Sequence, residues 1–214
     1  MAGPASTTAA VGPRLRRLRS ASGRSLGSVA QAVGISSSAL SQIETGVMQP
    51  SVNRLIEIVT VIGVPISAIF DDDAELAPVP IDGAAVEEPL AGVNVAAPGV
   101  VPSTVLGQGV TYRRLTPVTL RGVDLFESTY PPLTSSSIDG AMLVHQGFEA
   151  GSVVRGALCF EFSDGRVELT AGGSLSFWAS RPHRVVNESA DVEAVAIWLT
   201  LDNGQADHAH ALKA

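Results

Sequence analysis

The sequence has a single cysteine, few aromatic residues and no long uninterrupted apolar stretch. One cysteine excludes an internal disulfide and any zinc site built from several cysteines, and we expect Cys159 to be a small buried side chain in a strand. No apolar run approaches the roughly 20 residues that a membrane-spanning helix needs. The first residues have neither an arginine-rich opening nor the apolar core of a signal peptide. These absences predict a soluble, cytoplasmic protein that does not enter a membrane.

Charge is scarce and unevenly distributed: 16% of residues are charged and the net charge is −7. Residues 11–70 carry six arginines and two glutamates, whereas 71–102 carry seven acidic residues and no basic one. The latter stretch also holds five prolines and no apolar periodicity, which is typical of a linker. We therefore predict a disordered start (1–11), a basic domain (12–70), an acidic linker (71–102), a larger acidic domain (103–203) and a tail (204–214).

The basic domain has the pattern of a helical bundle. Serines precede apolar stripes of helical spacing, as helix caps do, and glycines follow the stripes, where a left-handed residue ends a helix. The predicted caps are Ser25, Ser36 and Ser51, and the predicted stops are Gly34, Gly46 and Gly63. Pro13 suits the first turn of the first helix, and residues 66–70 form a last turn. We expect five short helices.

The larger domain has the pattern of an antiparallel β protein. Alternating apolar residues at 158–162 are followed by Ser-Asp-Gly at 163–165, which predicts a tight turn into the next strand. Several more short strand-like runs are separated by Gly, Pro, Asp and Ser. A sandwich or barrel is the expected architecture.

The ordered set of cap, turn glycine, Ser-Gln-Ile-Glu at 41–44 and Gly-Val-Pro at 63–65 resembles the phage-repressor-type (XRE) helix-turn-helix domain. In that family the third helix lies in the DNA major groove. The resemblance implies base or phosphate contacts from one serine-rich helix and phosphate contacts from three arginines, although each arginine also suits a solvated helix face. The DNA-facing candidates are Ser36, Ser37, Ser38, Ser41, Gln42, Arg14, Arg17 and Arg54. The resemblance also makes Arg19 and Glu44 an inward structural ion pair.

Residues 145–156 and 172–187 resemble the two motifs of the cupin barrel, which implies a double-stranded β-helix over about 103–203. In that fold His145, Glu149 and His183 converge inside the barrel, while Leu143 stands where the family has another histidine. Two imidazoles and one carboxylate suit iron(II) or zinc. The same residues could instead bind an organic ligand by hydrogen bonds, or be a structural remnant. We expect Leu143, Phe148 and Trp178 to line the pocket.

The two resemblances together imply an XRE–cupin transcription regulator, similar to the putrescine-utilisation repressor branch. Its partners would be double-stranded operator DNA and a small-molecule effector, and a palindromic operator implies a homodimer, joined through the cupin domain. The alternative is a non-haem iron enzyme similar to hydroxypropylphosphonate epoxidase. Those enzymes take a substrate-binding lysine from a loop where this chain has Gly23, so we favour the regulator, most simply a repressor, over an enzyme.

Overall fold

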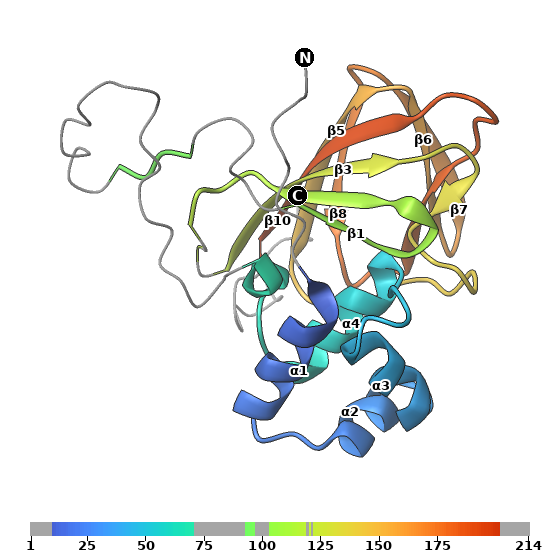
Figure 1. Ribbon diagram of the computed structural model, residues 1–214. Coiled ribbons are helices and arrows are strands. Elements are labelled where there is room, and N and C mark those ends of the chain that lie inside the picture. The colour runs from blue at the N-terminus through green and yellow to red at the C-terminus, as the bar shows by residue number, and fades with distance from the viewer. Residues whose placement is uncertain (1–9, 71–92, 97–102, 119, 121, 202–214) are drawn as a thin grey trace, which may run out of the picture.

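The computed structural model describes residues 10–70, 93–96, 103–118, 120 and 122–201. A group of helices lies against one end of a barrel of two β-sheets (Figure 1). The expectations for the tail and for most of the N-terminal segment and linker concern residues outside this described part. No helix in the described ranges combines the length and apolar character that crossing a bilayer requires.

The N-terminal domain has four α-helices and a short 3₁₀ helix. Four of the five predicted helices are therefore α-helices, and the fifth is the 3₁₀ turn at residues 66–70. They are α1 (Val11–Ala21), α2 (Leu26–Val33), α3 (Ser37–Glu44), α4 (Val52–Ile62) and η1 (Ile66–Phe70). The side chains of Ser25, Ser36 and Ser51 each accept a backbone N–H three residues on, as caps do. The first helix begins at Val11, which is buried and therefore belongs to the domain, not to the segment before it.

The first and third helices are held by a close backbone approach and an ion pair. A Cβ at Gly12 would lie 2.3 Å from the carbonyl oxygen of Ile43, so the backbones can approach this closely only because residue 12 has no side chain. Arg19 donates to both carboxylate oxygens of Glu44, at 2.6 and 2.8 Å, and Glu44 is only 5% exposed. The structure thus brings these two residues together inside the domain.

The C-terminal domain consists of two antiparallel sheets, as the strand pattern predicts. The strands are β1 (Ser103–Val105), β2 (Thr111–Arg114), β3 (Val123–Tyr130), β4 (Thr134–Ser135), β5 (Phe148–Arg155), β6 (Ala157–Phe162), β7 (Gly165–Thr170), β8 (Ser174–Trp178), β9 (His183–Asn187) and β10 (Ala194–Leu201). The larger sheet has the order β1-β2-β3-β10-β5-β8 and the smaller one β4-β9-β6-β7. Inward-facing aromatic rings fill the space between the sheets, with Trp198 of one lying 5.4 Å from Phe160 of the other. Cys159 is buried in β6, which confirms its expected placement.

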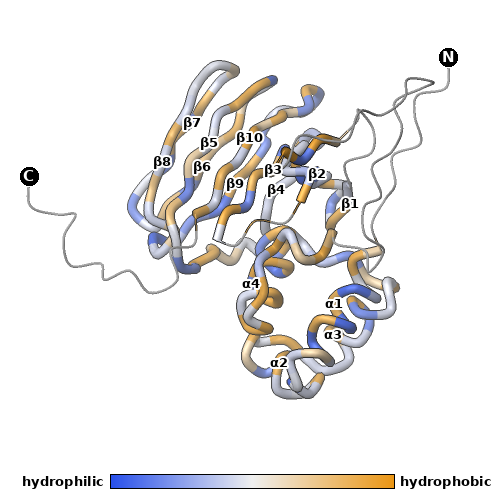
Figure 2. The backbone as a smooth tube through the Cα atoms, turned by 90° about the vertical axis from the view of Figure 1, so that its left-hand side faces the viewer, coloured by the Kyte–Doolittle hydropathy of each residue, from blue (hydrophilic) through white to orange (hydrophobic). Residues whose placement is uncertain are grey.

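The two domains pack directly on each other, with α4 nearest the barrel (Figures 1 and 2). The backbone N–H of Asn53 donates to the carbonyl of Ser136 at 2.9 Å, and its side-chain amide donates to the carbonyl of Ala141 at 3.1 Å. On the other side of the contact, the rings of Phe70 and Phe126 lie 5.6 Å apart. The charge pattern alone predicts two domains joined by a linker, and nothing in it indicates this contact.

We expect Arg19→Ala to lower the free energy of unfolding by about 3 kcal/mol, because it leaves the Glu44 carboxylate buried without its partner. Urea unfolding followed by circular dichroism measures the change. Arg16→Ala, an exposed arginine on the same helix, is the control and should have little effect. An Arg19→Ala protein as stable as wild type would contradict a structural role for the pair.

Candidate functional site

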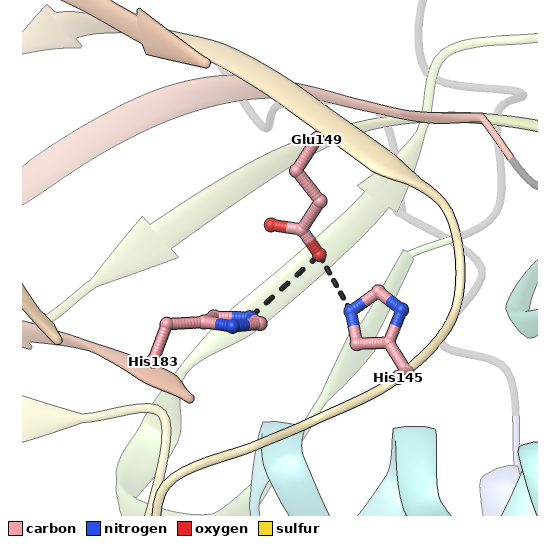
Figure 3. Close-up of side chains that lie close together, drawn as sticks. All are labelled: His145, Glu149 and His183. Carbon is pink, nitrogen blue, oxygen red and sulfur yellow. Dashed lines mark hydrogen bonds and ion pairs between the residues drawn. The ribbon is translucent and has the colours of Figure 1, made fainter. Parts of the chain in front are cut away.

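Three titratable side chains meet inside the barrel, at the end that faces the helical domain (Figure 3). Glu149 projects inward from β5 and His183 from the start of β9, while His145 comes from the segment before β5. Oε1 of Glu149 lies 2.7 Å from Nε2 of His145 and 3.8 Å from Nε2 of His183. The potential ligand atoms of all three residues lie within 4.8 Å of one another. The predicted convergence of these residues is therefore present in the geometry.

The hydrogen bonds around the histidines fix which ring nitrogens face the centre. Nδ1 of His145 lies 2.8 Å from the carbonyl oxygen of Gln146, and Nδ1 of His183 lies 2.8 Å from that of Arg181. A carbonyl oxygen only accepts, so each Nδ1 carries the hydrogen, and Nε2 of a neutral ring presents a lone pair. Two lone pairs then face the carboxylate of Glu149. Two acceptors do not approach to 2.7 Å unaided, so a shared hydrogen or a metal ion has to lie between Nε2 of His145 and Oε1 of Glu149.

Two further observations fit a metal ion. Oε2 of Glu149 is buried and has no hydrogen-bond partner, and an orphaned buried oxygen of this kind points to a missing ion or ligand. A ring nitrogen that donates to a backbone carbonyl is also the usual way in which proteins orient a metal-bound histidine. Burial lowers the pKa of His183 below its ordinary value of 6.5, although the nearby Glu149 acts in the opposite direction. The lowered pKa favours the neutral imidazole, which is the form that binds metals. His145, Glu149 and His183 would hold the ion.

A pocket adjoins this cluster and is lined by both domains. The barrel supplies mainly apolar and aromatic side chains, together with the carboxylate of Glu149 and the imidazole of His183. Its other lining residues are Tyr112, Phe126, Tyr130, Ser136, Leu143, Val185, Trp198 and Thr200. The helical domain supplies Val52, Asn53 and Ile56 from α4 and Ile66 from η1. Burial raises the pKa of Tyr112 and of Tyr130, so both phenols stay protonated in this setting.

Two residues that the sequence interpretation places in the pocket lie elsewhere. Successive side chains of a strand point to opposite faces, so an inward Glu149 turns its neighbour Phe148 outward. The same alternation turns Trp178 outward, beside an inward Phe177. The rings of Phe148 and Trp178 lie 5.2 Å apart on the outer surface of the sheet, which corrects their assignment to the pocket. Leu143 does line the pocket, as expected.

Sequence reasoning missed the aromatic wall of the pocket and the part of it that comes from the helical domain. Alternate residues of β2 and β3 are buried, which places Tyr112, Phe126 and Tyr130 on the inward face. The polar Asp124 and Ser128 share that face and the apolar Val123 and Leu125 lie on the other, so hydropathy alternation in the sequence gives no clear signal for these aromatic residues. No local pattern indicates that Val52, Asn53 and Ile56 would meet a barrel.

The face of α3 that should read DNA points into solvent. All five of its candidate residues are exposed, namely Ser36, Ser37, Ser38, Ser41 and Gln42. Leu40, Ile43 and Glu44, on the opposite face of the helix, are buried. The position of α3 away from the barrel leaves this face accessible while the domains are in contact (Figure 1).

The three candidate arginines differ in their surroundings. Arg17 is exposed on α1, and Arg14 is half-buried there and donates from Nε to the carbonyl of Ala68 at 3.0 Å. Arg54 lies between the domains. Its guanidinium contacts the carbonyl of Val33 at 2.7 Å, Glu57 at 2.8 Å and Asp139 of the barrel at 3.2 Å. These contacts give Arg54 an internal role in this arrangement.

Comparison with known proteins assigns the two parts of the chain separately. The family model described as a helix-turn-helix domain matches residues 10–68, and that of the cupin domain matches residues 128–200. The chain is 28% identical over 189 residues to the HTH-type transcriptional regulator PuuR of Escherichia coli, covering 86% of this chain and 90% of that protein.

One solved structure shares the two-domain fold over most of its length. The crystal structure of an HTH_3 family transcriptional regulator from Vibrio cholerae is 23% identical, with a TM-score of 0.62 and coverage of 90% of this chain and 95% of that one. Hydroxypropylphosphonic acid epoxidase from S. wedmorenis is 17% identical over 91% of this chain and 99% of that one, with a TM-score of 0.42. At that TM-score the second likeness supports no assignment of an activity.

We expect the purified protein, stripped with a chelator, to bind about one Zn²⁺ per chain in a calorimetric titration. Glu149→Gln should weaken binding by more than about 100-fold, because the loss of a direct ligand exceeds the 10–100-fold cost of losing an outer-shell partner. The control is Cys159→Ser, which alters a second group of possible ligands, Cys159, Glu161 and Glu188. Zinc binding that survives Glu149→Gln or disappears in Cys159→Ser would contradict the assignment, and so would a wild-type protein that binds no zinc.

Proposed function

Because the chain is a helix-turn-helix DNA-binding transcriptional regulator with a cupin domain, we propose that it represses transcription from a palindromic operator and that its barrel binds the effector that controls it. The observation that carries the proposal is the pairing of an exposed reading helix, α3, with a partly polar pocket next to the same domain. The likeness to a transcriptional regulator over most of both chains supports the DNA-binding half.

The contacts with DNA follow from the chemistry of α3. Gln42 offers a side-chain amide that can pair with both N6 and N7 of an adenine, while Ser37, Ser38 and Ser41 offer short hydroxyls with little preference. Ser36 and the exposed N–H groups at the start of the helix suit a phosphate oxygen. Arg14 and Arg17 of α1 supply positive charge for the DNA backbone, which positions the protein without reading sequence. The internal contacts of Arg54 leave it out of this set.

The effector half of the proposal rests on the chemistry of the pocket. A mostly apolar lining with a few convergent polar groups is typical of small-molecule sites. A bound metal would supply a Lewis acid that holds an oxygen or nitrogen atom of the effector. Leu143 stands at the position where the cupin family has another histidine. The ion would therefore have three protein ligands, with an apolar surface beside them. We propose binding and not catalysis as the use of this site.

A homodimer completes the proposal. Two helix-turn-helix domains must face half-sites about one DNA turn apart, which a two-fold dimer of barrels would provide. Its surface is on the barrel, since the reading helices have to remain exposed. The outer face of the larger sheet carries the packed rings of Phe148 and Trp178 and the exposed side chain of Ile197, so it offers apolar area for such a contact.

Gln42→Ala should weaken binding to the operator by about 1–3 kcal/mol and relax the preference for one base pair. Gel shifts with the DNA upstream of its own coding sequence, and with single-base variants of the bound site, measure both effects. Gln146→Ala, an exposed glutamine of the barrel, is the matched control and should bind like wild type. Affinity should also fall steeply as the salt concentration rises. A wild-type protein that prefers no duplex over another would overturn the proposed function.

A further inference from the structure

The pocket is closed on one side by the DNA-binding domain itself. Val52, Asn53 and Ile56 on α4 and Ile66 on η1 face the same cavity as Glu149 and His183 of the barrel. Whatever enters the pocket therefore meets the helical domain as directly as it meets the barrel. The domain proposed to bind DNA therefore also forms one wall of the pocket proposed to bind the effector.

Hydrogen bonds join α4 to the strand that carries His183. The N–H of Asn53 donates to the carbonyl of Ser136. Ser136 in turn donates its N–H to the carbonyl of Val185 at 2.8 Å, and its hydroxyl accepts the N–H of Val185 at 3.0 Å. Val185 lies in β9, two residues after His183. A single residue, Ser136, thus connects the start of α4 to the strand of the binding site.

A second connection runs through the side chain of Asn53. Its amide donates to the carbonyl of Ala141. Two residues further on, Leu143 exchanges two backbone hydrogen bonds with His183, of 2.8 and 3.0 Å. Both hydrogen bonds of Asn53 therefore end on segments that hold His183 in place. A movement of α4 would therefore shift the segments that hold His183, and a displacement of His183 would in turn shift α4.

The free space in the pocket is small. The cavity has a volume of about 30 Å³, which is room for about two water molecules. Pockets that hold small organic molecules are about 300–1,000 Å³. A metal ion held by Glu149 and the histidines is compatible with the present contact between the domains. An organic molecule of several atoms is not, unless one wall moves.

We propose that the helical domain is the movable wall of the effector pocket, so that an organic effector enters only as α4 withdraws from the barrel, and that this release lowers the affinity for the operator. This inference rests on the proposed function. The helical wall is held to the barrel by separate side-chain and backbone contacts: the hydrogen bonds of Asn53, the Arg54–Asp139 ion pair and the hydrogen bonds of Ser67 to Asp124 and Arg114. The other walls belong to continuous hydrogen-bonded sheets, so the helical wall is the one that can move as a unit. A guest that binds only the open form shifts the equilibrium towards it.

Release lowers DNA affinity for a geometric reason. While α4 is docked, each α3 is held at a fixed position relative to its barrel, and a dimer of barrels then holds both reading helices at one spacing. Released domains sample many spacings, and only a fraction of these suit two half-sites. The apparent affinity falls by that fraction.

The substitution Asn53→Asp tests the wall without disturbing the helix. It replaces a donor that faces the Ala141 carbonyl with an acceptor of the same shape, while an acid in the first turn of a helix is favourable in itself. Gly107 of the barrel domain donates its N–H to the carbonyl of Pro50, just before α4, at 2.8 Å. We expect the full-length variant to stay folded, to exchange the backbone amide hydrogens of position 53 and of Gly107 faster, and to expose His183 to diethyl pyrocarbonate. The rate of carbethoxylation of His183, followed by peptide mass spectrometry, should rise about tenfold. Asn94→Asp makes the same chemical change at an exposed position and should leave these rates unchanged.

A second variant approaches the contact from the barrel. Asp139→Asn removes the exposed charge that pairs with Arg54, while the amide oxygen can still accept the hydrogen bonds from Ser137 and Ala141 that shape this turn. It should raise the reactivity of His183 towards diethyl pyrocarbonate, as Asn53→Asp does. Unchanged reactivity of His183 in both folded variants would overturn the inference.

Operator binding provides the final measurement. Asn53→Asp should bind the operator about tenfold more weakly than Asn94→Asp at equal salt. Equal affinity despite a reactive His183 would overturn the coupling between the pocket and DNA. Gln42→Ala keeps these outcomes apart from failure of the proposed function, because it should lose DNA affinity with His183 still protected. If wild type binds no operator at all, the proposed function fails, whatever the reactivity of His183.

Discussion

The backbone N–H of Asn53 has no partner within its own helix, and this elementary constraint accounts for the contact between the domains. The first N–H groups of any α-helix lie beyond the reach of its own carbonyls. In α4 the hydroxyl of Ser51 satisfies the N–H of Arg54, and the carbonyl of Ser136 in the barrel satisfies that of Asn53. The helical domain is thus hydrogen-bonded to the barrel through a group that would otherwise need water, and this places α4 beside the binding cluster.

Much of the fold could be predicted because its signals are local. A serine three residues before an N–H group, or a glycine after an apolar stripe, determines a helix end with no reference to the rest of the chain. The β-strands and the tight turn after Phe162 are equally local. The contact of Asn53 with Ala141 joins residues 88 positions apart, and the sequence around neither residue indicates the other as its partner. That contact, and the wall it gives the pocket, could be found only in the structure.

The cluster of His145, Glu149 and His183 also has some features that the sequence predicts and others that it does not. Motif spacing brings Glu149 and His183 together correctly, because both lie on inward positions of their strands. Adjacency in sequence misleads for Phe148, since the neighbour of an inward residue points outward. Once Glu149 is taken as inward, strict alternation in β5 places Phe148 outside the barrel, and the apolar Leu175 and Phe177 of β8 place Trp178 there too. The tautomers of the histidines, in contrast, depend on the carbonyls of Gln146 and Arg181 and have no sequence signature.

Arg54 shows how the arrangement of the reading helix depends on the barrel. Its Nη1 donates to the carbonyl of Val33, the last residue of α2 and the one before the turn that leads to α3. Its Nη2 contacts Asp139 of the barrel. One guanidinium therefore binds both the last residue of α2 and a residue of the barrel. When α4 withdraws, this cation loses its barrel partner while keeping its contact with Glu57 on the same helix. The contact with Asp139 thus exists only in the docked arrangement, which links the position of the turn before α3 to the state of the pocket.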